Sequence, residues 1–175
     1  MTDPKYAKAN VNRTLINAPI ETVWSTLVAT DKALPFFFGS MCQTAEGLKP
    51  GARYRMVHPN KKIAMVVGEV IAFDPPHLYS HTFQMTNIDE PPCKVTYELT
   101  PKDGGTEFSL TIENAIEGGK LLKEMVSAQG FIGSNLKALC ETGKPAFTGR
   151  MVGILSPIFG LLAKKGQRIE NWPLK

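Results

Sequence analysis

The chain has 175 residues, of which 43% are hydrophobic and 21% are charged, and its formal net charge is +4. These values are typical of a globular protein with one domain, and no stretch contains the roughly 18 consecutive apolar residues that a membrane-spanning helix needs. The basic excess lies in residues 144–175, so the remaining chain lacks the basic stripe of a nucleic-acid-binding domain, and we expect no nucleic acid as a partner.

The N-terminus and the cysteines indicate a cytoplasmic protein. Residues 1–12 are polar, mixed in charge and without the apolar core of a signal peptide, so we expect a cytoplasmic location and an N-terminal tail over 1–10. The cysteines, Cys42, Cys93 and Cys140, are odd in number and widely spaced. This spacing argues against a disulfide framework and against a zinc site, and we predict no metal and no cofactor.

A strand and two short helices open the predicted domain, which we place at 11–143. Residues 11–16 alternate and are rich in β-branched side chains, which predicts a strand. Pro19 suits the first turn of a helix over 19–29, and a second short helix is expected over 31–38. The second helix ends in three consecutive phenylalanines, which cannot all face one core. At least one of them should therefore face a neighbouring cavity or loop.

Residues 41–114 change to a period of two, which predicts a meander of about six strands. The clearest hairpin turns at Lys102-Asp103-Gly104-Gly105, where the residues accept positive φ. The run 63–73 is apolar on both faces, so its register stays open. We favour the register that points Val67 and Glu69 inward.

One long amphipathic helix is predicted over 118–143. Its apolar side chains recur at intervals of four and three and so lie on one face: Leu121, Met125, Ala128, Ile132, Leu136 and Leu139. Gly143 can take the left-handed conformation that ends a helix, and Pro145 cannot continue one. Only this helix is long enough to cover one face of the sheet. The fold class is therefore α+β, with a curved antiparallel sheet of about six to seven strands wrapped around the helix.

This order of elements resembles the helix-grip fold of the START, birch-pollen-allergen and polyketide-cyclase superfamily, SRPBCC. Residues 13–24, with the Val23-Trp24 pair, look like its opening strand and helix. Within it, the chain is similar to the branch named for the activator of the ninety-kilodalton heat-shock protein ATPase. The motifs that carry this second likeness are Gly51, Gly68-Glu69-Val70, Asp74-Pro75-Pro76-His77-Leu78 and the last helix over 130–143.

In a helix-grip fold, the inward positions of the strands and of the long helix border a cavity, so the resemblance makes these positions candidate ligand contacts. Strand parity and helix spacing select Tyr54, Met56, Val67, Glu69, His81, Phe83, Tyr97, Phe108, Leu110, Met125 and Gln129. The polar members would orient a small apolar ligand through hydrogen bonds. An inward His or Tyr can equally be a satisfied core residue. A buried Glu69 would need a partner or a raised pKa, unless it faces water.

The resemblance implies three functions, because members of the superfamily bind lipids, polyketides, hormones or partner proteins, and a minority are enzymes. The first is a carrier or sensor of a small apolar ligand, lipid-like or polyketide-like. The second is a protein-binding module that stimulates a heat-shock protein ATPase, with a chaperone as its partner. The third is a cyclase or dehydratase in which His81, with Glu69 or Tyr97, performs acid–base chemistry. We assign no catalytic residue from sequence.

The C-terminal extension, 144–175, is apolar and then basic. Its segment 146–163 is rich in large apolar side chains but is interrupted by Arg150, three glycines and Pro157, and Lys164, Lys165 and Arg168 follow. Three interpretations remain open: a helical extension packed on the domain, a homodimer contact, or a peripheral membrane segment whose lysines meet anionic lipid.

Overall fold

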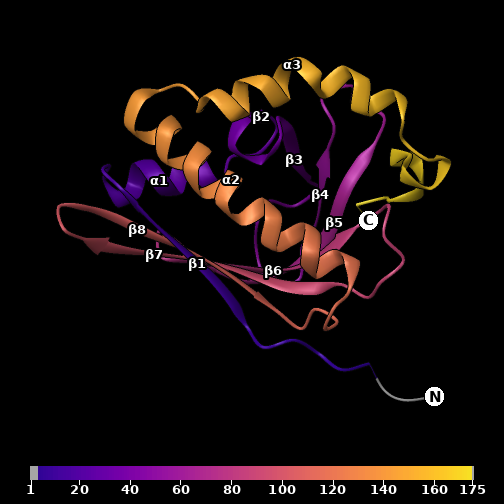
Figure 1. The fold of residues 1–175 in the computed structure, drawn as a ribbon, viewed down its shortest axis with the longest axis horizontal. Helices are drawn as coiled ribbons and strands as arrows, with labels where there is room; N and C mark the ends of the chain where they lie inside the picture. The colour runs from indigo at the N-terminus through magenta and orange to yellow at the C-terminus, as the bar shows by residue number, and fades with distance from the viewer. Residues whose placement is uncertain (1–3, 175) are drawn as a thin grey trace.

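An eight-stranded antiparallel sheet curls around one long helix (Figure 1). The computed structural model describes residues 4–174, without the side chains of Ser156, Pro157 and Phe159. In chain order, the strands, helices and 3-10 helices (η) of these residues are β1 (Asn10–Ile16), α1 (Ile20–Leu27), β2 (Ala33–Leu34), η1 (Pro35–Phe37), β3 (Ser40–Thr44), β4 (Arg53–Val57), β5 (Ala64–Asp74), β6 (Leu78–Met85), β7 (Cys93–Lys102), β8 (Gly105–Glu113), α2 (Lys120–Thr142), α3 (Phe147–Leu161), η2 (Lys165–Gln167) and η3 (Ile169–Asn171).

The sheet is a meander of seven strands, and β1 is added at its edge, next to β8. Strands β2 to β8 lie side by side in chain order, and β1 pairs antiparallel with β8. Asp103 and Gly104 have positive φ angles of 51° and 78° and form the β7–β8 turn, as the sequence predicts. The helix-grip α+β fold is thus confirmed. The sheet has eight strands rather than six or seven, because the two-residue strand β2 lies in the segment 31–38, which the sequence predicts as a helix.

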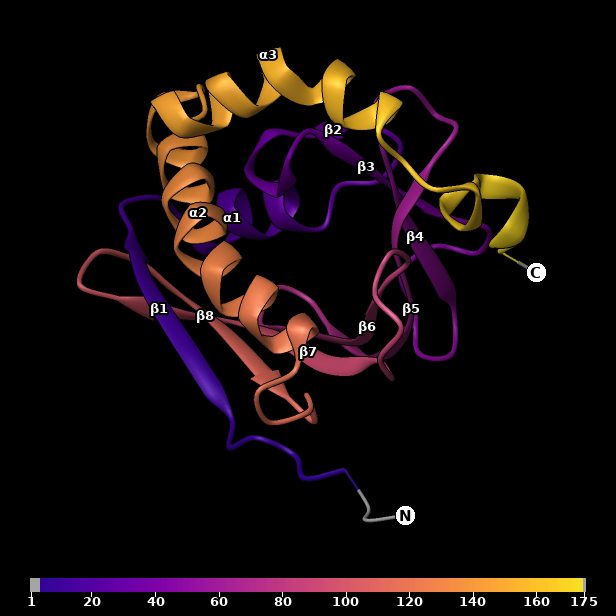
Figure 2. The ribbon, with the colours of Figure 1, turned by 45° about the vertical axis from the view of Figure 1, so that its right-hand side comes forward.

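Helix α2 lies in the concave side of the sheet (Figure 2). The buried residues of α2 include Leu121, Met125, Ile132 and Leu136 of the predicted apolar stripe. Its first turn starts at Lys120, where the Glu90 carboxylate accepts hydrogen bonds from the backbone N–H groups of Lys120 and Leu121 (2.6 and 3.1 Å). A negative charge at this end complements the helix dipole. The predicted end is correct: Gly143 has a φ of 72°, and its N–H donates to the Leu139 carbonyl at 2.9 Å.

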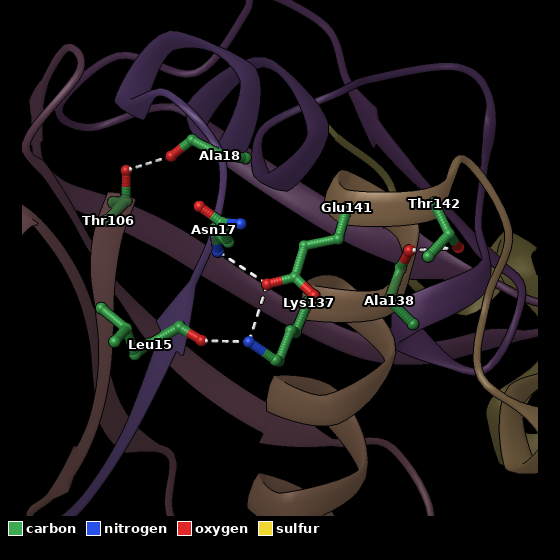
Figure 3. A network of polar contacts seen from close by, with 8 residues as sticks. All are labelled: Leu15, Asn17, Ala18, Thr106, Lys137, Ala138, Glu141 and Thr142. Atoms are coloured by element: carbon green, nitrogen blue, oxygen red, sulfur yellow. Dashed lines mark hydrogen bonds and ion pairs between the residues drawn. The ribbon is translucent and has the colours of Figure 1, made fainter. Parts of the chain in front are cut away.

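A polar network ties the C-terminal end of α2 to the corner between β1 and α1 (Figure 3). Glu141 Oε1 accepts hydrogen bonds from the backbone N–H of Asn17 (2.6 Å) and from Lys137 Nζ (2.7 Å), and Lys137 Nζ also donates to the Leu15 carbonyl (2.6 Å). Lys137 first, and then the Asn17 N–H, lower the pKa of Glu141. The carboxylate therefore holds the helix end in register with the sheet edge.

The segment after α1 differs from the prediction of a second short helix. Residues 31–38 contain the two-residue strand β2 and the single 3-10 turn η1. Phe38, the residue after η1, takes a left-handed conformation with a φ of 55°, which ends the turn at once. Phe36 and Phe37 are buried and Phe38 is partly exposed. The three rings thus divide between different surroundings, as their crowding in sequence predicts.

Helix α3 forms a strap across the open side of the curled sheet, from the end of α2 toward the β4–β5 hairpin (Figures 1 and 2). Two of its glycines are its contact points. Gly149 packs on the Asn135 side chain of α2, and a Cβ at Gly160 would come within 2.8 Å of both His58 and Asn60. After α3, Ile169 N–H donates to the Lys62 carbonyl (3.0 Å), which fixes the tail on the same hairpin.

Candidate functional site

A small cavity of about 30 Å³ lies between the concave face of the sheet and the segment from α1 to η1. Three of its wall residues come from β6, namely Tyr79, His81 and Phe83, because alternate positions of that strand point inward. Strands β4 and β7 add Tyr54, Met56 and Tyr97. The wall opposite these strands is Leu27, Val28, Ala29, Leu34, Phe36 and Phe37, and Cys42 of β3 and Leu48 of the β3–β4 connection complete the lining.

His81 lies at the centre of an aromatic cluster on this face. Its ring centroid is 4.5 Å from that of Tyr79, 5.0 Å from that of Tyr54 and 5.3 Å from that of Tyr97. Only 2% of the His81 surface is exposed. The imidazole is thus held in one orientation by packing on several sides.

One ring nitrogen of His81 belongs to a three-atom hydrogen-bonded unit. Tyr54 Oη lies 2.8 Å from His81 Nδ1 and 2.9 Å from the Thr82 carbonyl oxygen, and His81 Nδ1 lies 3.2 Å from that oxygen. The carbonyl can only accept. All three groups are therefore satisfied when Nδ1–H donates to Tyr54 Oη and the Tyr54 hydroxyl donates to Thr82.

The other ring nitrogen, Nε2, is buried and has no hydrogen-bond partner among the described residues. Because Nδ1 carries the proton, Nε2 presents a lone pair. An unpaired buried polar atom costs roughly 1–3 kcal/mol, and in most proteins such an atom meets water or a ligand. The geometry of the cavity therefore offers one hydrogen-bond acceptor in apolar surroundings.

The site carries no charge near neutral pH. Burial lowers the pKa of His81 to about 4, and the hydrogen bond to the Thr82 carbonyl opposes this shift without cancelling it. Burial raises the pKa of Tyr54 and Tyr97 above their ordinary value. Burial, with a smaller contribution from Asp31, raises the pKa of Cys42 to about 12. A neutral cavity of this kind favours an uncharged molecule over an ion.

Two larger cavities continue from this one in series, the first next to it and the second next to the first. A cavity of about 100 Å³ lies under α2 and shares Phe37 and Phe83 with the central cavity. A third, of about 450 Å³, lies under α3 and shares Phe38 and Met65 with the second. The α3 cavity has the volume of a typical ligand pocket, roughly 300–1,000 Å³. The phenylalanine side chains at 37 and 38 are thus the partitions between the three spaces.

The structure places six of the eleven sequence-predicted site residues along two neighbouring cavities. Tyr54, Met56, His81, Phe83 and Tyr97 line the central cavity, and Met125 lines the cavity under α2.

Three further predicted residues are buried in the core but line none of the cavities described here: Phe108, Leu110 and Gln129. The side-chain amide of Gln129 donates to the Leu110 carbonyl (3.3 Å), which is the role of a satisfied core residue.

The predicted inward orientation of Val67 and Glu69 is wrong. In β5 the buried positions are Ala64, Val66 and Val70, while Glu69 is exposed. Both Val67 and Glu69 border a groove of about 290 Å³ on the outer face.

Gly68 explains this register. It pairs with Tyr54 across the β4–β5 ladder, and a Cβ at this position would lie 2.6 Å from the Tyr54 ring. The tyrosine ring fills the inward position that the glycine leaves open. Glu69 therefore faces away from the site.

Sequence reasoning missed part of the cavity wall, namely Phe36 and Phe37 of η1, which lie opposite the strands, and Cys42 of β3. These residues lie in short or irregular elements, where neither a period of two nor a helical period can be read. The run of three phenylalanines was the one signal for this wall.

Comparisons with known proteins agree with this architecture. Residues 17–141 match the family model described as Activator of Hsp90 ATPase homolog 1-like protein. No curated protein matches the chain.

Several solved structures share the fold. The chain is 15% identical to the Aha1 dimer protein from Colwellia psychrerythraea, with a TM-score of 0.62 over 79% of this chain and 99% of that one. It is 19% identical to an HSP90 activator from Plasmodium falciparum, with a TM-score of 0.58 over 79% and 99% of the two chains. For protein Ms6760 from Mycobacterium smegmatis the identity is 22% and the TM-score 0.53, over 75% and 94%. At these identities the likeness shows the fold alone.

Proposed function

The chain belongs to the family of Activator of Hsp90 ATPase homolog 1-like proteins, and from this premise we propose that it binds a small, mostly apolar molecule around His81, as a carrier or sensor. The molecule is lipid-like or polyketide-like and donates one hydrogen bond to Nε2. The observation that carries the proposal is the unpartnered Nε2 atom, which is buried in an aromatic cavity. A hydroxyl group on an apolar body is the simplest chemistry that fits both features.

Binding requires the cavity to expand, because about 30 Å³ holds little more than a water molecule. Phe37 is the side chain whose movement would join the central cavity to the one under α2. It lies on η1, a single 3-10 turn, and so belongs to one of the shortest elements of the fold. The polar group of the ligand would then sit at His81, with its apolar body under α2 and α3.

The low pKa of His81 supports a binding role over a cyclase or dehydratase. A general base works best with a pKa near the working pH, whereas burial lowers the pKa of this imidazole to about 4 and so weakens it as a base. Glu69, the proposed partner in such chemistry, lies on the opposite face of the sheet.

A co-chaperone function is the second candidate, and the family match favours it. In this role the chain would bind a heat-shock protein and raise its ATPase rate. A pull-down with the purified chaperone and an ATPase assay test it directly. An unchanged ATPase rate at saturating amounts of this protein would reject it.

The ligand-binding proposal is tested with two matched probes, 1-decanol and decyl methyl ether. They share the alkyl chain, but only the alcohol donates a hydrogen bond. We expect the alcohol to raise the melting temperature of the full chain more than the ether does. This preference should disappear in His81→Phe, which keeps a ring of similar shape.

His77→Gln is the matched control, because His77 precedes the same strand and its side chain is exposed. It should keep the preference for the alcohol. Native mass spectrometry of the purified chain gives an independent measurement of bound ligand. If no ligand co-purifies and neither probe shifts the melting temperature, the proposal is wrong.

A further inference from the structure

The outward side of α3 is a continuous stripe of large apolar side chains. They recur at helical spacing and are between 40% and 85% exposed: Phe147, Met151, Ile154, Leu155, Ile158 and Leu161. We call these residues the outer stripe. Single exposed apolar residues are ordinary, but a run of this length along one helix face marks an interaction site.

The outer stripe cannot turn inward while α3 keeps its contacts with the domain. The opposite side of the helix carries Gly149 and Gly160, which lie close to Asn135 and to the β4–β5 hairpin, and Val152, which lines the cavity under α3. Small side chains let the helix backbone approach its support closely. The large side chains of the outer stripe are therefore presented to the surroundings.

Basic residues flank the outer stripe at both ends. Lys144 and Arg150 lie at the start of α3, and Lys164, Lys165 and Arg168 follow its end, all with exposed side chains. Between Glu141 and Glu170 the sequence has these five basic residues and no acidic one. An apolar helix face with cations at its ends matches the two layers of a lipid surface, acyl chains and anionic headgroups.

We propose that the outer stripe docks on an anionic lipid surface, with α3 lying in the plane of the interface. None of the described helices is long and apolar enough to cross a bilayer, which agrees with a helix that rests on the surface. A symmetric dimer through the same stripe would bring two copies of the basic ends together and add repulsion between like charges. The proposal does not depend on ligand binding at His81.

Vesicle flotation of the full chain tests this docking. Vesicles of phosphatidylcholine alone are compared with vesicles that also contain about 30% phosphatidylserine, which supply the negative surface potential. We expect the protein to float with the anionic vesicles, to stay behind with the neutral ones, and to dissociate when salt is raised.

Two sets of substitutions separate the apolar from the electrostatic contribution. The double variant Ile154→Gln with Leu161→Gln removes two of the most exposed apolar side chains and should abolish flotation. Lys164→Gln with Lys165→Gln should lower the partition coefficient by about 30-fold, at roughly fivefold for each charge. Ile71→Gln is the matched control, since Ile71 is 46% exposed on β5, away from α3, and this variant should bind as the unaltered chain does.

The readouts also separate the alternative occupants. Circular dichroism melting of each variant checks that the fold is retained, and the exposed positions chosen should leave it unchanged. Absence of flotation, or equal flotation with neutral and anionic vesicles, would overturn the proposal. So would a chain that sediments as a dimer and becomes a monomer in the Ile154→Gln, Leu161→Gln variant, because the outer stripe would then be covered by a second copy.

Discussion

At the scale of single residues, His81 combines a satisfied nitrogen with an unsatisfied one. Tyr54 and the Thr82 carbonyl fix the first, so the ring cannot rotate to find a partner for the second without losing these hydrogen bonds. Burial makes a positive charge on the ring unfavourable, which is why the pKa falls to about 4. The residue is therefore an uncharged acceptor at neutral pH, and the aromatic rings around it hold the acceptor in place.

The burial of His81 should make the free energy of unfolding depend on pH. In the unfolded chain a histidine takes up its proton near pH 6.5, whereas folded His81 does so near 4. Between these values the unfolded state binds more protons, so stability falls as the pH falls through this window. The full difference corresponds to about 3 kcal/mol of unfolding free energy. Urea unfolding of the full chain at several pH values from 7.5 to about 4 measures it.

Two variants separate His81 from the other titrating groups. His81→Phe should lose this pH-dependent part, so its unfolding free energy should change less between pH 6.5 and 4.5 than that of the unaltered chain. His77→Gln, at an exposed position, should follow the unaltered chain. Identical slopes for the unaltered chain and His81→Phe would mean that His81 titrates normally, and the picture of a neutral buried site would fail.

At the scale of elements, sequence periodicity identified those with one buried face. The alternation of β6 and β7 correctly placed His81, Phe83 and Tyr97 toward the site, because polar residues mark the other face. In β5 both faces are apolar, so parity carried no information, and the register depended on Gly68 making room for the Tyr54 ring. The contact between Gly68 of β5 and Tyr54 of β4 cannot be predicted from the sequence of either strand alone.

The two glycines inside α2, Gly130 and Gly133, have different surroundings. Gly133 is buried, and a Cβ there would contact the Thr14 hydroxyl of β1 closer than van der Waals distance. Gly130 is exposed, and a Cβ there would meet nothing within 4 Å. Close packing of helix on sheet thus explains the first glycine. Nothing in the structure explains the second.

This difference predicts opposite effects of the same substitution. Gly133→Ala should lower the unfolding free energy by about 1–2 kcal/mol, because Thr14 or the helix must shift. Gly130→Ala should raise it by up to about 1 kcal/mol, because alanine favours the helix and meets no obstacle. Urea unfolding of the two variants side by side measures both. Equal changes in the two variants would show that α2 does not approach β1 as closely as described.

At the scale of the whole molecule, the curled sheet is closed by chain segments from both ends of the sequence. Helix α2 fills its concave side, and α3 with the following tail crosses its open edge to the β4–β5 hairpin (Figure 1). The sequence predicts the first closure, since a long amphipathic helix needs a surface. The sequence leaves the second closure open between three interpretations, because the small residues of α3 contact the domain and its large apolar residues are exposed. In most helices the large apolar residues face the core, so the sequence pattern of α3 does not show which side packs on the domain.

Arg55 connects this tail to the sheet, and its removal tests how far the strap contributes to stability. Its Nη1 donates to the carbonyls of Ile169 (3.3 Å) and Trp172 (2.9 Å), and its Nε donates to Gln43 Oε1 (2.9 Å). Arg55→Ala should therefore free the tail and lower the unfolding free energy by about 1–2 kcal/mol. The more specific readout is hydrogen exchange at the Ile169 amide, which donates to the Lys62 carbonyl and should exchange faster.

The comparison with Arg13→Ala makes this prediction specific, because Arg13 is exposed on β1, at the opposite edge of the sheet from β2. In that control, exchange at Ile169 should be unchanged. Amides within β7 and β8 should keep their protection in both variants, since the tail crosses the β4–β5 hairpin and not these strands. Faster exchange in β8 after Arg55→Ala would mean that the tail is part of one cooperative unit with the whole sheet. Faster exchange confined to the tail and the β4–β5 hairpin would mean that the strap opens locally while the helix-grip core stays folded, which is the behaviour that entry of a ligand beneath α3 requires.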